Sequence, residues 1–300
     1  MKRYRDIAGD GGSDIVGQIE AQQARLRARM GTIRRTVAVV SGKGGVGKSA
    51  VTANLAAALA GEGYAVGVLD ADLNGPSIAK MLGVRGQTLQ VTEAGVVPAT
   101  SAEGIRVLSM DLLLPSDETP VVWDAPTQSE AHAWRGSMEA QALREFLADT
   151  AWGALDVLLL DLPPGTDRLP TVAGLLPDLT GAVVVTIPSE VSHLVVRKSI
   201  TLAREAGTRL LGLVENMAGY VCLHCGTLGA LFEGPGGERT AGQAGIPFLG
   251  RVPFDPRLAV AADRGRPFVA EHGDTPAGRA IRDVAARLAQ ALLAPTEPAR

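Results

Sequence analysis

Short, almost uniformly apolar runs recur along the chain from residue 36 onward. They are too apolar for strands with one solvent-facing side and are typical of strands that a sheet buries on both faces. Helical stretches lie between them, and this alternation predicts parallel strand–helix–strand units in one doubly wound α/β sheet flanked by helices. The predicted strands are 36–41, 65–70, 105–109, 156–161, 182–187, 210–216 and 248–252, and the predicted helices are 48–60, 137–150, 190–206 and 276–293.

Two segments depart from this alternation. Residues 88–98 (TLQVTEAGVVP) predict a small hairpin inserted between two units, and residues 14–30 have helical spacing. We therefore divide the chain into a helical N-terminal extension (1–35), one α/β domain (36–293) and a disordered tail (294–300). Because the extension carries a local net charge of +4, it is either a solvated leading helix or a docking segment for a partner or an acidic surface.

Composition narrows the class of protein. Hydrophobic residues make up 46% of the chain and charged residues 20%, which supplies a buried core and excludes a disordered chain. The net charge of −3 argues against a protein that binds nucleic acid with its whole surface. No apolar run reaches the length of a membrane span, and residues 1–6 lack the apolar centre of a secretory signal. We expect a soluble, cytoplasmic protein with no nucleic acid or membrane partner.

A phosphate-binding loop follows the first predicted strand directly and leads into a predicted helix. Residues 41–49 (SGKGGVGKS) satisfy the pattern G-x-x-x-x-G-K-[ST]. Its glycines let backbone N–H groups close around phosphate oxygens, and the helix adds its positive N-terminal end. A glycine-rich turn that binds nothing would not account for the strand, both lysines and the helix together. The residues predicted to bind nucleotide are Gly42, Lys43, Gly44, Gly45, Val46, Gly47, Lys48 and Ser49.

Two of these residues have predicted roles in the chemistry of the phosphates. Lys48 is expected at the β- and γ-phosphates, and the Ser49 hydroxyl is expected to bind Mg²⁺. Lys43, at the start of the loop, points away from the β-phosphate of its own site. It can project toward a nucleotide held by a facing subunit, although a solvated loop lysine is the simpler interpretation of this residue alone.

Acidic residues stand at the carboxyl ends of two predicted strands. Asp70 and Asp72 follow one strand, and Asp161 ends another. Ligands bind beyond this edge of an open parallel sheet, so a carboxylate there can reach the Mg²⁺ shell or orient an attacking water. A strand-end Asp is often only a turn or helix cap. The presence of the phosphate loop favours a functional role for Asp72 and Asp161, whereas the role of Asp70 is ambiguous.

Five motifs occur in a fixed order along the chain: SGKGGVGKS (41–49), DADLNGPS (70–77), DLPPGT (161–166), ENM (215–217) and CLHC (222–225). This order resembles that of Mrp-type ATPases, the iron–sulfur cluster carriers of the deviant Walker A group, whose signature lysine corresponds to Lys43. The chain resembles this family over residues 36–289, and WRG at 134–136 is similar as well. The loop alone is shared with septum-site-determining, chromosome-partitioning and nitrogenase-iron-protein ATPases, whereas the conjunction of motifs is much more specific.

The resemblance implies a homodimer that encloses two ATP molecules. In such a dimer Lys48 serves its own site and Lys43 reaches across to the other. Asp72 corresponds to the residue that positions or activates water, Asp161 to the Mg²⁺-linked acid, and Gly165 to the switch residue that senses the γ-phosphate.

At the base, the resemblance implies a hydrogen bond from Asn216 to the adenine edge, which favours ATP over GTP. Pro253 and Asp255 lie where the family closes over the base. One departure from the family pattern concerns the second switch, which reads DLPPGTDRLPT with one glycine fewer and a proline at position 170. This difference predicts a stiffer switch or one that is coupled differently to ATP.

Cys222 and Cys225 are separated by two residues, a spacing that lets both sulfurs face one metal. In a reducing compartment such a pair is more often a metal or redox site than a structural disulfide. One pair supplies two of the four ligands that a [4Fe–4S] cluster needs, and a two-fold dimer supplies four at its axis. The spacing allows such a cluster, and the resemblance to the carrier family leads us to predict it. A zinc ion bound by four thiolates and cysteines without a metal are the two alternatives. His224 is expected to face away from the metal.

These features predict a slow, Mg-dependent ATPase that carries a [4Fe–4S] cluster as a homodimer and transfers it to apo client proteins, with ATP as a conformational switch. The alternative is a spatial-positioning ATPase that binds DNA or a membrane through its ATP dimer, since that class shares Lys43, Lys48 and Asp72. The chain end at 293–300 lacks the basic amphipathic character of a membrane anchor. An electron-donating reductase is a weaker alternative, because it draws its cluster cysteines from two separated loops.

Overall fold

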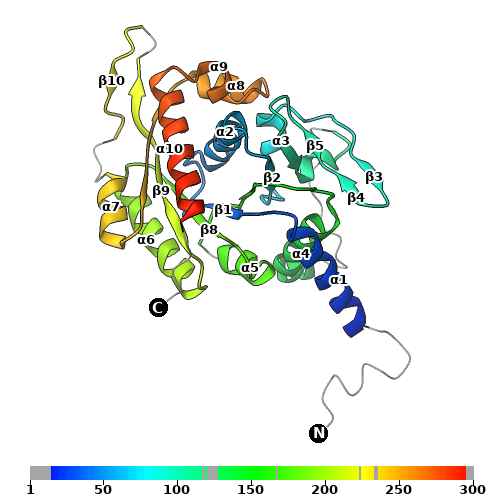
Figure 1. Cartoon of the computed structure of the whole chain (residues 1–300). Coiled ribbons are helices and arrows are strands. Elements are labelled where there is room, and N and C mark those ends of the chain that lie inside the picture. Colours follow the sequence, from blue (N-terminus) through cyan, green and yellow to red (C-terminus); the bar gives the residue numbers. More distant parts are fainter. Residues whose placement is uncertain are drawn as a thin grey trace.

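A nine-stranded, mostly parallel sheet runs through the molecule with helices on both faces (Figure 1). The computed structural model describes residues 15–116, 119, 128–166, 168–222, 224–232 and 236–294, with the backbone alone at 15–16 and 128–135. The strands are β1 (Thr36–Ser41), β2 (Val66–Asp70), β3 (Gln90–Thr92), β4 (Gly95–Val97), β5 (Ala99–Thr100), β6 (Arg106–Leu108), β7 (Val157–Asp161), β8 (Gly181–Thr186), β9 (Leu210–Val221), β10 (Leu228–Gly229) and β11 (Phe248–Phe254). Their order is β10-β9-β8-β1-β7-β2-β6-β5, with β11 beside β9. The predicted doubly wound α/β fold is confirmed.

Every predicted strand is present, and its burial explains the apolar runs. β1, β7 and β8 are buried at each of their positions. β9 differs most from the prediction, because its 12 residues continue to Val221. The predicted hairpin is the antiparallel pair β3–β4, which forms a separate sheet. The antiparallel strands β5 and β10 have two residues each, too few for a periodic signal.

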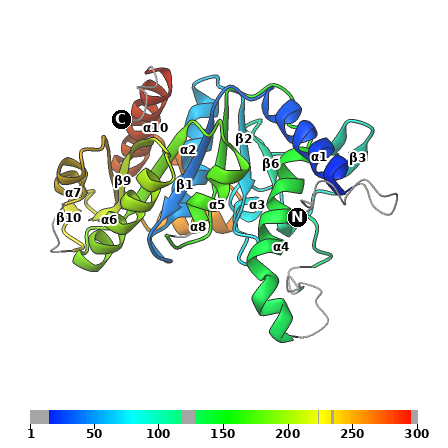
Figure 2. The ribbon, with the colours of Figure 1, turned by 90° about the horizontal axis from the view of Figure 1, so that it is seen from below.

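Helices cover the two faces of the sheet as a doubly wound fold requires (Figures 1 and 2). The helices are α1 (Ile15–Met30), α2 (Lys48–Gly61), α3 (Ile78–Met81), α4 (Gln128–Asp149), α5 (Arg168–Leu175), α6 (Glu190–Glu205), α7 (Gly237–Ala244), α8 (Arg257–Asp263), α9 (Phe268–His272) and α10 (Pro276–Leu293). α2, α3, α8, α9 and α10 lie on one face, and α1 and α4–α7 lie on the other. The four long helices of the domain were predicted, whereas the five short ones were not.

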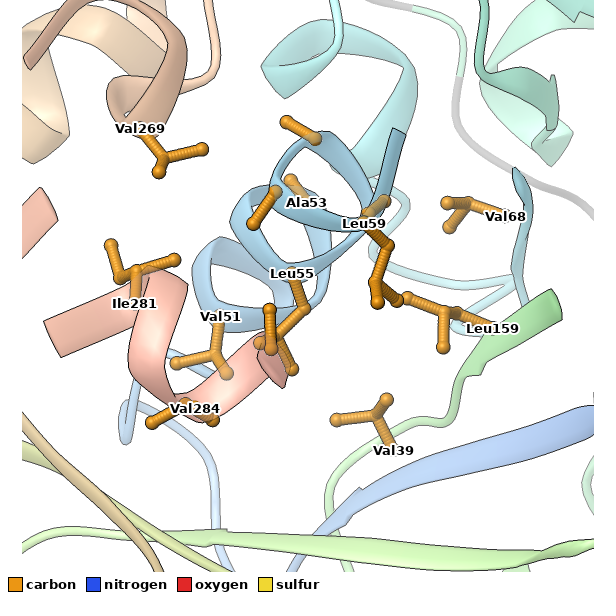
Figure 3. Packing of buried hydrophobic residues seen from close by; sticks show 14 of the residues in the cluster. Val39, Val51, Ala53, Leu55, Leu59, Val68, Leu159, Val269, Ile281 and Val284 are labelled. Atoms are coloured by element: carbon orange, nitrogen blue, oxygen red, sulfur yellow. The ribbon is translucent and has the colours of Figure 1, made fainter. Parts of the chain in front are cut away.

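α2 lies between the sheet and α10 and is buried along most of its length. Figure 3 shows Val51, Leu55 and Leu59 of α2 within one apolar layer that also holds Val39 of β1 and Val284 of α10. Because this helix is covered on all sides, its sequence is apolar all round instead of having one apolar stripe. The packing holds the N-terminal end of α2 against the carboxyl end of β1.

α1 packs against α4 near one edge of the sheet (Figure 2). Leu26 is buried, and the Arg29 guanidinium donates hydrogen bonds to the carbonyls of Ala94 and Ala148. The predicted solvated helix therefore packs on the core through Leu26, while most of its other described side chains, Ile19 among them, are exposed. Residues 1–14 and 295–300, and the side chains of Trp134 and Arg135, lie outside the described residues. None of the described helices is long and apolar enough to cross a membrane.

Candidate functional site

The predicted phosphate loop connects β1 to α2 at the carboxyl end of the central strand. Gly45 and Gly47 have φ values of 79° and 77°, in the left-handed region that favours glycine. A Cβ at Gly47 would lie 2.3 Å from Nδ2 of Asn216, and a Cβ at Gly42 would lie 2.5 Å from Cγ1 of Val195. The loop conformation therefore depends on its glycines. Its backbone stands at the N-terminal end of α2, where N–H groups favour an anion.

Lys48 and Asp161 form a buried ion pair, with 2.6 Å between Nζ and Oδ2. The Asp161 carboxylate ends β7 and accepts hydrogen bonds from the hydroxyls of Ser49, at 2.6 Å, and Thr52, at 2.7 Å. The fold thus brings Lys48 and Ser49 of the phosphate loop into one cluster with Asp161, which belongs to a separate motif. Thr52 was not predicted, although its position four residues after Lys48 places it on the same face of α2.

Asp70 ends β2 directly beside the end of β7 and is fully buried. Burial and the neighbouring charge of Asp161 raise the pKa of Asp70 to about 7. Its Oδ2 accepts hydrogen bonds from the backbone N–H groups of Ser77, at 2.9 Å, and Ile78, at 3.0 Å, and from the Ser109 hydroxyl, at 3.1 Å. Asp70 therefore anchors the far end of the loop 71–77.

Asp72 is half-buried within that loop, and its Oδ1 accepts a hydrogen bond from a backbone N–H of the same loop. Asn74, also in the loop, donates to Oε1 of Glu139 at 2.7 Å. Oε2 of the same carboxylate lies 2.5 Å from Nη1 of Arg168, at the start of α5. Glu139, on α4, is only 8% exposed. It joins the loop that carries Asp72 to the helix that follows DLPPGT, and nothing in the local sequence points to it.

The DLPPGT segment lies against the start of the phosphate loop. Gly165 has a φ of 128° and donates its N–H to the carbonyl of Ser41 at 3.0 Å. Pro170, the residue that departs from the family pattern, is the third residue of α5. A proline in the first helical turn removes no intrahelical hydrogen bond, so the helix accepts it. Residue 167 lies outside the described residues.

A cavity of about 300 Å³ lies beside the phosphate loop. Its walls come from α2, α8, α10 and the neighbouring strands β9 and β11, and they are mostly apolar. Asn216 lies on the wall and donates from Nδ2 to the carbonyl of Val46 at 2.9 Å, so it also supports the loop. Met217, Phe254 and Leu258 supply apolar surface. An apolar slot with few polar groups next to a phosphate loop suits a nucleoside base.

Pro253 and Asp255, the two residues that the resemblance placed near the base, are not among the residues that line this cavity. Val252 and Phe254 line the cavity, and strand alternation turns Pro253 to the other face of β11. Asp255 is fully buried, and its carboxylate is held by the guanidinium of Arg257 at 2.6 and 2.9 Å. It fixes the start of α8, and it is not on the cavity wall.

Lys43 is half-buried at the start of the phosphate loop, and its carbonyl accepts a hydrogen bond from the Ser41 hydroxyl at 3.1 Å. The loop touches α6 one residue earlier, at Gly42. On α6, Val191 and Leu194 expose 63% and 50% of their surface. Large apolar side chains at such exposure are suited to contact with another protein surface.

Cys222 and Cys225 lie in the turn 222–227 of the β9–β10 hairpin, which projects from the body of the molecule (Figure 1). The N–H of Cys222 donates to the carbonyl of Thr227 at 3.0 Å, which closes the turn. Both cysteines are free; Cys222 is half-buried and Cys225 is exposed. The hydroxyl and the backbone N–H of Thr227 hydrogen-bond to the Cys225 sulfur and lower its pKa, which favours the thiolate that binds metals.

Within the described part of the chain, no group of three or more His, Cys, Asp or Glu side chains is placed to hold a metal ion. His224, in the spacer, is exposed. After the turn, Leu228, Leu231 and Phe232 expose 56%, 42% and 38% of their surface. The two thiols therefore stand beside exposed apolar side chains, the composition of a surface that meets another protein.

Comparison with known proteins identifies the family to which this chain belongs. The family model for the ParA family, described as the NUBPL iron-transfer P-loop NTPase, matches residues 32–289. An iron-sulfur cluster carrier protein of Saccharolobus solfataricus is 45% identical over 269 residues, which cover 89% of this chain and 87% of the relative. The cytosolic Fe-S cluster assembly factor NUBP2 of Bos taurus is 42% identical over 261 residues, which cover 85% and 92%.

Solved structures extend the comparison. A nucleotide-binding protein from Archaeoglobus fulgidus in complex with ADP is 38% identical, with a TM-score of 0.70 over 82% of this chain and 92% of that one. The MinD cell division protein of Aquifex aeolicus is 22% identical, with a TM-score of 0.58 over 85% and 97%, and this likeness shows the fold alone. On the match of nearly the whole domain and the identity to these relatives, the chain belongs to the ParA/NUBPL family of iron-transfer P-loop NTPases.

Proposed function

We propose that this protein is a slow, Mg-dependent ATPase that works as a cytoplasmic homodimer and carries a [4Fe–4S] cluster to apo client proteins. The observation that carries the proposal is the position of two free thiols on a projecting hairpin, joined to the nucleotide cavity by one strand. Relatives of 42–45% identity named as a cluster carrier and a cytosolic assembly factor support it.

The phosphate end of the site supplies the groups that phosphoryl transfer needs. Lys48 would bind the β- and γ-phosphates, and Ser49 with Asp161 would bind Mg²⁺. Their oxygens lie 2.6 Å apart, so one ion can take both as ligands. Asp72 would position the attacking water. Gly165, held against the phosphate loop, would respond to the γ-phosphate through its backbone.

The cavity would hold the adenine between apolar side chains, with Asn216 available to the edge of the base. Met217 and Phe254, which line the cavity, would supply apolar surface against the base. The Asn216 amide already binds the phosphate loop, so this residue would link recognition of the base to the shape of the loop.

Dimer formation would complete both sites. Lys43 would reach the nucleotide of the facing subunit, and the exposed Val191 and Leu194 beside the loop would be covered by the second copy. Two hairpins meeting at the two-fold axis would bring four thiolates together, which is the ligand count of a [4Fe–4S] cluster. A bridging cluster held by exposed thiols would be accessible to clients, and nucleotide-driven closure of the dimer would change that access.

The test is anaerobic reconstitution with iron and sulfide of the wild type, the Cys222→Ser/Cys225→Ser double variant and the control His224→Ala. Iron, acid-labile sulfide and zinc are quantified per dimer. We expect about four iron and four sulfide in the wild type and the control, and none in the double variant, with ATP binding equal in all three. Zinc in place of iron, or equal iron in the double variant, would overturn the carrier function.

A further inference from the structure

One strand joins the proposed base cavity to the cysteine hairpin. Asn216 and Met217 of β9 line the cavity, and Cys222 directly follows the last residue of this strand. Asn216 is fixed at the phosphate loop by its hydrogen bond to Val46. The short segment 217–221 therefore separates a side chain held at the nucleotide site from the first thiol.

This segment of β9 contains a bulge. Val252 of β11 pairs with Asn216 and Phe254 pairs with Tyr220, so β9 advances four residues where β11 advances two. A bulge bends its strand and redirects the chain beyond it. The direction in which the cysteine hairpin leaves the sheet therefore depends on residues 217–219.

Met217 occupies the bulge with a φ of 54°, and it is the one non-glycine residue with a positive φ in the described part of the chain. A residue with a Cβ is strained in this conformation, which persists only where the surroundings enforce it. The Met217 side chain lies on the cavity wall, and its Cε would be 3.5 Å from a Cβ at Gly47. A ligand in the cavity would touch the residue whose backbone sets the bulge.

A second contact connects the same two places. Phe254, on the cavity wall, stacks on Tyr220 with ring centroids 6.4 Å apart and planes inclined by 26°. Tyr220 stands two residues before Cys222 and pairs with Gly229 across the hairpin. If the Phe254 ring were displaced, Tyr220 would therefore move with it and shift the base of the hairpin.

We propose that Met217 and Tyr220 are positioning residues that make the geometry of Cys222 and Cys225 depend on nucleotide occupancy. The inference rests on the proposed function, because it takes the cavity as the base site and the thiols as cluster ligands. A base that presses on Met217 and Phe254 shifts the balance between left-handed and extended backbone at Met217, and the bulge transmits this change to the turn.

The test measures how fast a maleimide alkylates Cys222 and Cys225 in the metal-free, full-length protein, with and without a non-hydrolysable ATP analogue and Mg²⁺. All variants are compared at equal occupancy of the nucleotide site, set from each measured Kd, and at an equal fraction of dimer, measured by sedimentation velocity. Any burial of the thiols by dimer formation is then the same in every variant. We expect the analogue to change the wild-type rate about fivefold or more.

Two substitutions at position 220 form a matched pair. Tyr220→Leu removes the ring stack and is expected to reduce the response below about twofold, whereas Tyr220→Phe keeps the ring and the wild-type response. Met217→Gly, which allows either sign of φ without strain, is expected to reduce the response, and Met217→Leu is expected to retain it.

The proposal would be overturned if the analogue leaves the alkylation rate of the wild type unchanged. It would also be overturned if the analogue changes the rates of Tyr220→Leu and Tyr220→Phe equally. If Tyr220→Leu does not fold, the comparison of Met217→Gly with Met217→Leu decides. Iron and sulfide loading of the same proteins reports on the carrier function separately. If the analogue changes the alkylation rate of the thiols but the protein loads no cluster, the carrier function alone is wrong. If the protein loads cluster but the analogue leaves the alkylation rate unchanged, this inference alone is wrong.

Discussion

The ammonium of Lys48 lies 2.6 Å from Oδ2 of Asp161, and both side chains are buried, with relative exposures of 6% and 0%. The cation proposed to bind phosphate and the acid proposed to bind Mg²⁺ thus neutralise each other. A phosphate that binds Lys48 must compete with this carboxylate, and Mg²⁺ must replace the ammonium as the counter-charge of Asp161. Binding of the two ligands is therefore expected to be strongly interdependent.

Lys48→Ala is expected to abolish nucleotide binding and to lower the free energy of unfolding by about 3–5 kcal/mol, because it leaves a buried carboxylate without its partner. The double variant Lys48→Ala/Asp161→Asn should recover part of the stability and none of the binding. Titration with a fluorescent ATP analogue and denaturant unfolding measure the two effects. Lys198→Ala, an exposed position on α6, is the control, and equal stability of Lys48→Ala and this control would contradict the account.

Gly47→Ala is expected to weaken nucleotide binding and to destabilise the fold. The new Cβ would lie 2.3 Å from Nδ2 of Asn216, and a φ of 77° costs a non-glycine residue about 1–2 kcal/mol. Gly174→Ala on α5, where a Cβ meets nothing within 4 Å, should instead raise stability by about 0.5–1 kcal/mol. Thermal unfolding and nucleotide titration of the pair distinguish the two sites. The same stability change in both variants would show that Asn216 does not constrain the loop.

Glu139→Ala is expected to lower the kcat of ATP hydrolysis about tenfold or more and to change KM little. The reason is that the buried Glu139 carboxylate accepts hydrogen bonds from Asn74 and Arg168 and so fixes the loop 71–77 relative to α5. Steady-state kinetics of Glu139→Ala, Asn74→Ala and the double variant should show non-additive losses. Glu145→Ala, an exposed position on the same helix, is the control and should retain wild-type kinetics. Additive losses would mean that Glu139 does not connect the loop 71–77 to the start of α5.

The buried His193 is expected to make the protein less stable in acid. Burial lowers its pKa below the usual 6.5, and Nδ1 lies 2.6 Å from the Thr240 hydroxyl of α7. Because the unfolded chain then binds a proton more readily than the native state, stability falls as pH drops below about 6.5. Denaturant unfolding at pH 7.5 and pH 5.5 should show a smaller acid-induced loss in His193→Asn than in the wild type. The control His224→Asn, at an exposed position, should lose as much stability between pH 7.5 and pH 5.5 as the wild type. An equal loss of stability in His193→Asn would contradict the account.

Local features of this protein could be predicted from the sequence, because each depends on residues that are close along the chain. The alternation of apolar strands and helices sets the doubly wound fold. The spacing of glycines around Lys48 sets the phosphate loop, and Asp161 lies at the carboxyl edge of the sheet because it is the last residue of a strand. Cys222 and Cys225 are likewise close along the chain, so their proximity to each other needs no knowledge of the rest of the fold.

Relationships between distant segments depended on tertiary structure. Glu139 meets Asn74 and Arg168 only because α4 passes beside both the loop 71–77 and the start of α5, and no spacing in the sequence encodes that contact. The face of β11 that lines the cavity is set by its register on β9, since a shift of one residue exchanges Phe254 for Pro253. The bulge at Met217 exists only in the pairing of two strands. The sequence by itself therefore determined which groups are proposed to bind phosphate and metal, and tertiary packing decided what lines the cavity beside the phosphate loop and how that cavity connects to the cysteines.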